Sequence, residues 1–244
     1  MNSLLRRMQD SIQSTQAGAL HIRAGSFAVT VHPDNPLPWC NDAVPESEPE
    51  PHDVAVMVAA FQKYERKPRL EFFEDLWPNV PALLEAYGFR LKDTQPALAV
   101  RREEWRTHSS QIEVRMATPE DAEAINKVAD VAFDGDGPDP NRVSGIRESL
   151  AAGRSRAAVA SIEEMIVGCG RIVGAKDVRE VIAIGTLPEY RRKGVGTAVT
   201  AALVDDFFAS GGEIAWLSAA PGAEDVYTKL GFTPVAQQVC YLKD

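Results

Sequence analysis

The sequence has few cysteines, no long apolar run and no excess of positive charge, and each of these absences excludes a class of protein. Its three cysteines, Cys40, Cys169 and Cys240, lie far apart and form no Cys-x-x-Cys pair. A zinc site or a disulfide scaffold is therefore not expected, and a reducing cytoplasm suits the chain. No apolar stretch approaches the ~20 residues of a membrane-spanning helix. Residues 1–14 lack the apolar core of a signal peptide and are typical of a short amphipathic helix.

Acidic residues outnumber basic ones, 35 against 26, and the formal net charge is −9. Nucleic acid and anionic membranes are therefore disfavoured as partners, because phosphate groups in quantity need a broad basic face. A hydrophobic fraction of 45% is enough for one or two globular cores. We expect a cytoplasmic protein with no nucleic-acid or membrane partner, and a homodimer stays open.

The polar segment REEWRTHSSQ (102–111) separates two patterns and is the predicted domain boundary. It divides a first domain, residues 1–106, from a second domain, residues 112–244. In the first, the proline- and acid-rich stretch 35–53 predicts an irregular surface loop. The patterns around it predict strands at 27–31, 69–76 and 97–100, and helices at 54–64 and from Pro78 to Gly88.

The second domain alternates strands and helices and predicts an α/β fold, with a mixed central sheet flanked by helices. Thr118 and Pro119 are typical of a helix N-terminus. The loop 133–142 superficially resembles a calcium loop, but Pro138 occupies a ligand position, so no metal is expected. The expected strands are 112–116, 156–162, 165–174, 180–187 and 213–219, and Gly168 and Gly170 inside one of them are attributed to packing.

A basic, glycine-containing corner, PEYRRKGVGTAV (188–199), joins the apolar strand 180–187 to a helix. Unpaired N–H groups and the positive end of the helix dipole favour an anion at such a place. Gly194 and Gly196 let a phosphate approach the backbone. The corner is neither a Walker A loop nor a dinucleotide fingerprint, because the glycine patterns differ. An exposed basic turn is the plainer alternative, and the strand–turn–helix context favours the phosphate site.

The run RRKGVG (191–196) matches the Arg/Gln-x-x-Gly-x-Gly/Ala motif, and residues 112–244 resemble the GCN5-related N-acetyltransferase (GNAT) superfamily. The resemblance implies that amides around Arg192 to Thr197 hold the pyrophosphate of acetyl-CoA. It also implies that the preceding strand end pairs with the pantetheine arm. The implied cofactor-binding residues are Ile184, Gly185, Thr186, Arg191, Arg192, Lys193, Gly194, Val195, Gly196 and Thr197.

A second stretch, AEDVYTKLGF (223–232), resembles another signature of that superfamily. It implies that Tyr227 protonates the departing thiolate, since a phenol can give a proton at neutral pH. Packing of a half-buried tyrosine beside Phe232 is the alternative. Glu180 stands eleven residues before Arg191, at the spacing of the general base in related histone acetyltransferases. A solvated glutamate, with a water chain as base, is equally open.

Two further features bear on the acceptor and on the first domain. Asp134, Asp136 and Asp139 could attract a cationic amine, although a solvated acidic loop is the favoured interpretation. LLEAYGF (83–89) can be laid over VYTKLGF (226–232), with Leu84 in the place of Tyr227. The first half therefore resembles a degenerate GNAT-like domain without the chemistry.

Together these features predict an acetyl-CoA-dependent N-acetyltransferase, in which a primary amine attacks the thioester directly. The acceptor is a small molecule or a peptide, either a lysine or an N-terminus, and the sequence does not choose between them. The acyl group is acetyl by default. The alternative is an inactive acyl-CoA-binding regulatory or interaction protein.

Overall fold

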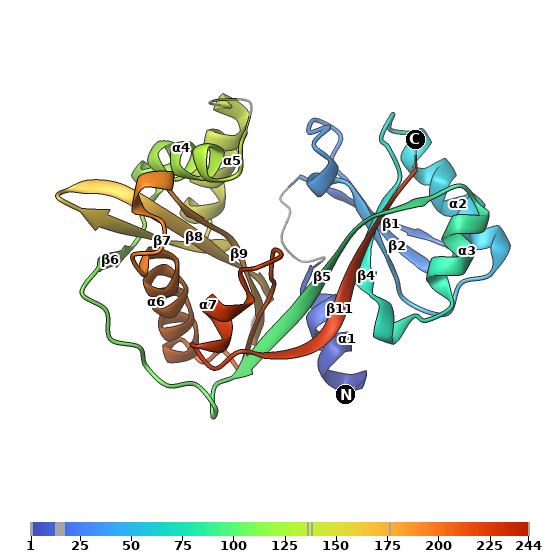
Figure 1. The fold of residues 1–244 in the computed structure, drawn as a ribbon. Helices are drawn as coiled ribbons and strands as arrows, with labels where there is room; N and C mark the ends of the chain where they lie inside the picture. The colour runs from blue at the N-terminus through green and yellow to red at the C-terminus, as the bar shows by residue number, and fades with distance from the viewer. Residues whose placement is uncertain (1, 13–17, 136, 138, 176, 244) are drawn as a thin grey trace. The chain divides into compact units, whose positions relative to one another are not determined.

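The computed structural model describes residues 2–12, 18–135, 137, 139–175 and 177–243 and divides the chain into two compact units (Figure 1). The first unit comprises Met1–Ala97 and Pro234–Asp244, and the second comprises Leu98–Thr233. In the described part of the chain, no helix has both the length and the apolar character needed to cross a membrane.

The first unit is a sheet of strand order β1-β2-β3-β4-β11-β5 with helices on both faces. Its strands are β1 (Leu20–Ala24), β2 (Phe27–Val31), β3 (Asp42–Pro45), β4 (Arg69–Phe73), β5 (Arg90–Arg101) and β11 (Thr233–Leu242). Its helices are α1 (Asn2–Ile12), α2 (Pro51–Gln62) and α3 (Val80–Ala86), with 3-10 turns η1 (Pro38–Cys40) and η2 (Glu74–Leu76). Residues of α2 and α3, among them Met57, Phe61 and Leu84, share a buried core with the sheet. Helix α1 packs against β4 and η2.

The expectation of an irregular surface loop at 35–53 is wrong. Asp42–Pro45 is strand β3, and all four of its residues are buried. It pairs with β2 antiparallel and with β4 parallel. This strand was not predicted because the segment has prolines at 36, 38 and 45, and a proline normally argues against a central strand. Strand β1 was also not expected, although it forms a hairpin with β2.

The second unit has the strand order β5-β10-β9-β8-β7-β6 and confirms the predicted mixed sheet flanked by helices. Strands β6 to β9 are antiparallel neighbours, whereas β10 runs parallel to β9. The strands are β6 (Glu113–Met116), β7 (Ser155–Ile162), β8 (Met165–Ala175), β9 (Val178–Thr186) and β10 (Ile214–Ser218). The helices are α4 (Ala122–Ala132), α5 (Pro140–Ala151), α6 (Val195–Ala209) and α7 (Glu224–Thr228), with 3-10 turns η3 (Pro119–Asp121) and η4 (Pro188–Tyr190).

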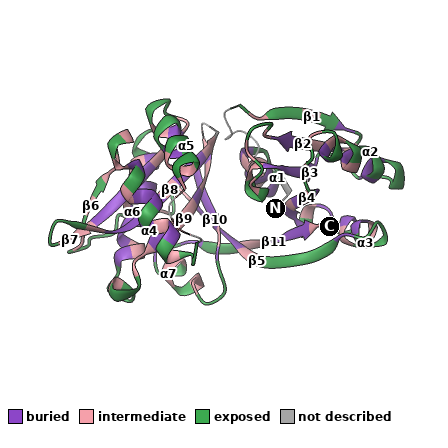
Figure 2. Ribbon diagram, turned by 90° about the horizontal axis from the view of Figure 1, so that it is seen from above, coloured by how far each residue is buried: buried purple, intermediate pink, exposed green. Residues whose placement is uncertain are grey.

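Helix α6 lies on one face of this sheet so closely that two glycines of β8 are required. Val195, Val199, Leu203 and Phe207 follow one another at intervals of four along α6 and form an apolar stripe, and each is at most 1% exposed (Figure 2). A Cβ at Gly170 would lie 2.3 Å from Cδ1 of Ile184 and 2.8 Å from Cγ1 of Val199. A Cβ at Gly168 would lie 2.3 Å from Cγ1 of Val195. The interpretation of both glycines as packing residues is confirmed.

The other face of the sheet carries α4 and α5. Ile125, Val128 and Ile146 form a core there with β7 and β8. The predicted helix start at Thr118 is confirmed by a capping box, in which Oδ2 of Asp121 accepts from the Thr118 N–H at 2.8 Å. A Cβ at Gly185 of β9 would lie 3.1 Å from Cβ of Ala132, so α4 also covers the end of β9.

The structural division of the chain, at Ala97/Leu98 and again at Thr233/Pro234, differs from the boundary predicted at 102–111. Trp105 donates from Nε1 to Oδ1 of Asp205 in α6 at 2.7 Å and packs edge-on against Phe208, so the polar segment belongs to the second unit. The last strand, β11, pairs antiparallel with β4 of the first unit and buries Val239 and Tyr241 in its core. Pairing between residues about 170 positions apart leaves no local sequence signal.

Candidate functional site

The basic corner lies where β9 ends and α6 begins. Gly194 is the N-cap of α6, with φ +85°, and no side chain caps this helix end. The first bond of the helix is Ala198 N–H to the Gly194 carbonyl at 3.0 Å. The N–H groups of Val195, Gly196 and Thr197 precede it and therefore lack intrahelical acceptors. No acidic residue occupies the first turn, so the positive end of the helix dipole is not neutralised there.

Different constraints favour glycine at the two glycine positions of the corner. At Gly194 the positive φ disfavours other residues, although a Cβ would point into open space. At Gly196 a Cβ would lie 3.5 Å from Cγ2 of Ile184 and 3.9 Å from Oγ1 of Thr186. A side chain there would begin to fill the space above the end of β9. The two glycines thus leave the backbone N–H groups of the corner accessible to a ligand.

The three basic residues of the corner do not act alike. Arg191 donates from Nε to the Thr186 carbonyl at 3.3 Å and from Nη2 to the Ala132 carbonyl at 3.1 Å. It therefore ties the corner to the end of β9 and to the end of α4. Lys193 places Nζ 4.9 Å from the centre of the Tyr190 ring. Arg192 is exposed and has a positive φ of 64°. The sequence had placed all three among the cofactor-binding residues without distinguishing them.

Strand β9 leaves one edge open next to the corner. The register of β9 with β10 pairs Val178 with Ile214 and ends, in the described residues, at Glu180 with Trp216. From Val181 to Thr186 the strand continues beyond that pairing. Only Val178, Val181 and Gly185 of its nine residues are buried, although a strand this apolar is typically covered on both faces. An open strand edge is a template for an extended ligand.

A β-bulge lies in the same part of β9 and was not expected. Strand β8 pairs Cys169 with Gly185 and Arg171 with Ile182, so Gly170 alone opposes both Ala183 and Ile184. Ala183 has φ +54°. Such bulges turn backbone groups out of the regular ladder and are frequent beside active sites. Alanine is not a usual bulge residue, so the sequence carried no signal for it.

Tyr227 lies on the short helix α7 and packs against the core beneath α6. Its ring meets that of Phe232 edge-on, with centroids 6.2 Å apart. Burial raises the pKa of the Tyr227 phenol above its ordinary value. The hydroxyl therefore stays protonated at neutral pH, as a proton donor requires. Both sequence interpretations, the acid and the packing residue, agree with this environment.

Glu180 is the last residue of β9 that pairs with β10, opposite Trp216. Val181 points into the core under α6, so strand alternation places Glu180 on the opposite face, together with Ile182. Glu180 is partly exposed and has interaction partners of its own. Its position fits either a base near the open edge of β9 or a structural carboxylate.

The acidic loop after α4 has structural uses for its side chains. Asp139 is the N-cap of α5 and accepts from the Asn141 N–H at 2.9 Å. Asp134 is exposed with φ +51°, and Asp136 lies outside the described residues. In the described part of the chain, no three His, Cys, Asp or Glu residues are grouped as metal ligands. These contacts favour the interpretation of an acidic loop over that of an amine site.

Comparison with known proteins identifies the fold and the domain. Residues 122–232 match the model of the acetyltransferase (GNAT) family, and this stretch contains the corner, β9 and Tyr227. The second unit therefore contains a stretch that matches a GNAT acetyltransferase domain. A comparison with curated protein sequences found no match.

Solved structures share the architecture of the whole chain. A GCN5-related N-acetyltransferase from Kribbella flavida has a TM-score of 0.79 and 23% identity, covering 99% of this chain and 94% of its own. A GNAT-family protein from Novosphingobium aromaticivorans has a TM-score of 0.64 and 16% identity, over 98% and 96%. A tandem GNAT protein of the clavulanic acid biosynthesis pathway has a TM-score of 0.62 and 14% identity, over 90% and 78%. The two-unit fold is thus that of GNAT proteins, some of them tandem.

Proposed function

We propose that the protein is an acetyl-CoA-dependent N-acetyltransferase acting on a primary amine. One observation carries the proposal: the uncapped N-terminus of α6 adjoins an open strand edge of β9. The helix end can bind an anion, and the open edge of β9 can bind an extended chain. A CoA thioester has both groups, because its pyrophosphate is followed by the extended pantetheine arm. The match of residues 122–232 to an acetyltransferase family supports the same substrate.

Each group at the site then has a defined task. The N–H groups of Val195, Gly196 and Thr197 bind pyrophosphate oxygens, with Arg192 and Lys193 at the rim. Arg191 acts on the binding indirectly, because its bonds to the Thr186 and Ala132 carbonyls hold the corner in place. Backbone groups of Ile184, Gly185 and Thr186 pair with the pantetheine amides.

In the reaction the neutral amine nitrogen attacks the thioester carbonyl carbon. The new C–N bond forms as the C–S bond breaks, and the thiolate takes the phenolic proton of Tyr227. The attacking amine loses its extra proton to Glu180, directly or through water. The acidic chain suits a cationic acceptor, either a small molecule or a peptide.

The decisive experiment compares the wild-type protein with Tyr227→Phe. We expect CoA release with any accepted amine to slow more than tenfold, because a positioned acid contributes ~10²-fold or more. The acetyl-CoA dissociation constant from calorimetry should stay nearly unchanged. Tyr87→Phe is a matched control, since it removes a partly exposed phenol from the first unit.

Three outcomes separate the alternatives. Binding of acetyl-CoA with turnover that Tyr227→Phe does not alter would remove Tyr227 from the chemistry. Binding without turnover across an amine panel would favour the acyl-CoA-binding regulatory protein. No binding by the wild-type protein would exclude both functions.

A further inference from the structure

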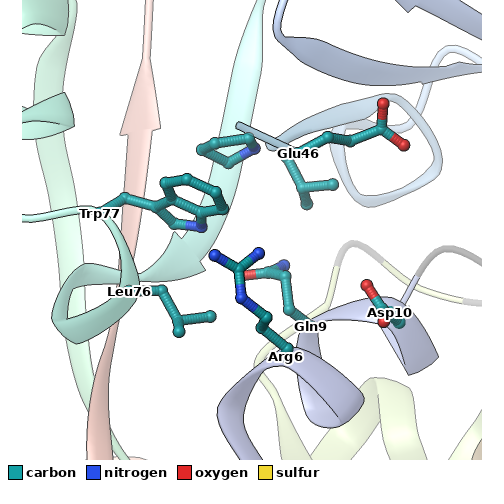
Figure 3. A pocket seen from close by; sticks show the side chains of 8 residues that line it. Arg6, Gln9, Asp10, Glu46, Leu76 and Trp77 are labelled. Atoms are coloured by element: carbon teal, nitrogen blue, oxygen red, sulfur yellow. The ribbon is translucent and has the colours of Figure 1, made fainter. Parts of the chain in front are cut away.

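A cavity of about 200 Å³ lies within the first unit, at the ends of the parallel strands β3 and β4 (Figure 3). Glu46 follows β3 directly, and Leu76 and Trp77 follow β4. Helix α1 closes one side with Arg6, Gln9 and Asp10. Ligands of open α/β sheets commonly bind outside the carboxyl ends of parallel strands. The volume suits a molecule much smaller than a CoA thioester.

One N–H donor of the cavity is buried without an acceptor, and an exposed guanidinium lies beside it. Trp77 is 4% exposed, and its buried Nε1–H has no hydrogen-bond partner in the described structure. The Arg6 guanidinium lies 5.1 Å from the centre of the same ring. Figure 3 shows the indole nitrogen on the side of the ring that faces Arg6. A buried donor without an acceptor is unfavourable, so these two groups suit an anion between them, above all a carboxylate.

The opposite charge lies across the cavity. In Figure 3 Glu46 and Asp10 both lie on the side of the cavity away from Trp77, with their carboxylates apart from one another. Glu46 has a weak outside partner, Arg23, at 3.6 Å in an exposed pair. A cation bound inside the cavity would therefore compete for Glu46 with a weak ion pair to Arg23. The cavity thus offers an anion site and a cation site, and Val44 and Pro45 add apolar side chains to its lining.

The wall that carries Arg6 is held in place. Gln9 is 4% exposed, and its Oε1 accepts from the Phe73 N–H at the end of β4 at 3.1 Å. Leu5 and Met8 of the same helix are fully buried. Helix α1 is thus anchored to the sheet by packing and by this bond, and the cavity exists before a ligand arrives.

We propose that this cavity binds a small zwitterion of the amino-acid class. Its carboxylate accepts from the Trp77 indole N–H and from the Arg6 guanidinium, and its ammonium group donates to Glu46 on the acidic side of the cavity. The site is separate from the acetyl-CoA site and does not depend on the proposed transferase activity. A phosphate-rich ligand is disfavoured, because Glu46 and Asp10 line the cavity with negative charge.

The test follows the Trp77 indole signal in ¹H–¹⁵N spectra of the whole chain. The sequence has four tryptophans, and the signal lost in Trp77→Phe identifies the right one. The probes are 5-aminopentanoate, pentanoate and pentylamine, which have the same five carbons. We expect 5-aminopentanoate to shift the Trp77 signal and to saturate below ~50 mM, pentanoate to bind more weakly, and pentylamine to leave the signal in place.

Variants locate the two charges. Arg6→Gln should weaken 5-aminopentanoate binding at least ~tenfold, the scale of one charge-assisted hydrogen bond. Glu46→Gln should weaken 5-aminopentanoate severalfold and leave pentanoate unchanged. Arg90→Gln, which removes an exposed charge of the first unit outside the cavity, should change neither.

The proposal is overturned by any of three results. The first is no saturable shift of the Trp77 signal with any probe, as expected of a cavity that holds only water. The second is an unchanged affinity in Arg6→Gln. The third is pentanoate binding as tightly as 5-aminopentanoate, which would remove the ammonium site.

Discussion

The two units contain the same strand–corner–helix arrangement with opposite electrostatics. In the second unit β9 leads through Arg191, Arg192 and Lys193 to an uncapped α6, whose N-cap is Gly194. In the first unit β3 leads through glutamates to α2, which begins with Pro51 and has Asp53 in its first turn. Oδ2 of Asp53 accepts from the Glu50 N–H at 2.9 Å and from Oγ of Ser26 at 2.9 Å. A carboxylate of the chain therefore occupies the helix end that α6 leaves to a ligand.

The likeness extends to the helices that follow. Leu84 accepts through its carbonyl from the N–H groups of Tyr87 and Phe89, and Tyr227 accepts likewise from Leu230 and Phe232. Gly88 and Gly231 have φ of +81° and +91°. The alignment of LLEAYGF with VYTKLGF thus has the same backbone geometry, while Leu84 has no proton to give. The same backbone framework thus carries the proposed acetyl-CoA site in the second unit, whereas the first unit has the framework without the proposed proton donor.

The largest expected effect is the loss of acetyl-CoA binding in Gly194→Asp, which puts a carboxylate at the α6 corner. We expect the dissociation constant measured by calorimetry to rise at least ~100-fold, because like charges in contact cost several kcal/mol. Gly194→Asn is the matched control, since asparagine tolerates a positive φ and adds no charge. The affinity of this control for acetyl-CoA should fall less than ~tenfold. Equal losses in both variants would assign the effect to backbone strain.

The close packing of α6 is tested by Gly170→Ala. A Cβ there meets Ile184 and Val199, so the free energy of unfolding in urea should fall by about 1–3 kcal/mol. Gly145→Ala in α5 has open space around its Cβ and should instead raise stability by about 0.5–1 kcal/mol. A Gly170→Ala protein as stable as the wild type would show that α6 can shift away from β8.

Neutralising Asp53 tests the self-capped corner of the first unit. Asp53→Asn should lower the free energy of unfolding by about 1 kcal/mol at pH 7, as for a lost helix cap. The hydrogen bond from the Glu50 N–H lowers the pKa of Asp53. Its stabilisation is therefore complete above the unfolded pKa near 3.9 and is lost as the pH falls through the lower folded value.

The variant should consequently lose less stability than the wild type as the pH falls below ~4. Glu50→Gln changes an exposed side chain at the same helix end and should alter stability by less than ~0.5 kcal/mol. An equal pH dependence in Asp53→Asn and the wild type would contradict the role given to Asp53.

The smallest effects distinguish the arginines of the basic corner. Arg192→Gln should weaken acetyl-CoA binding severalfold, more so at low salt, and leave stability unchanged, as expected of an exposed charge. Arg191→Gln should also lower the free energy of unfolding by about 1 kcal/mol, because it loses hydrogen bonds to two carbonyls. Urea unfolding alongside calorimetry separates the two, and identical behaviour would show that the Arg191 bonds contribute nothing.

The sequence by itself determined the features that depend on neighbouring residues. The corner 191–196, the capping box at Thr118 and the stripe along α6 follow from spacings of a few positions, which set helix ends and faces directly. The mixed sheet was predicted for the same reason, because apolar residues repeat with a different spacing in strands and in helices.

Only the tertiary structure decided what depends on partners far along the chain. The pairing of β11 with β4, the burial of β3 and the open edge of β9 each depend on which strands lie together. The inward bonds of Arg191 and the cavity beside Trp77 likewise join distant segments. Which distant strands pair depends on the total free energy of the fold, and no single stretch of sequence determines that free energy.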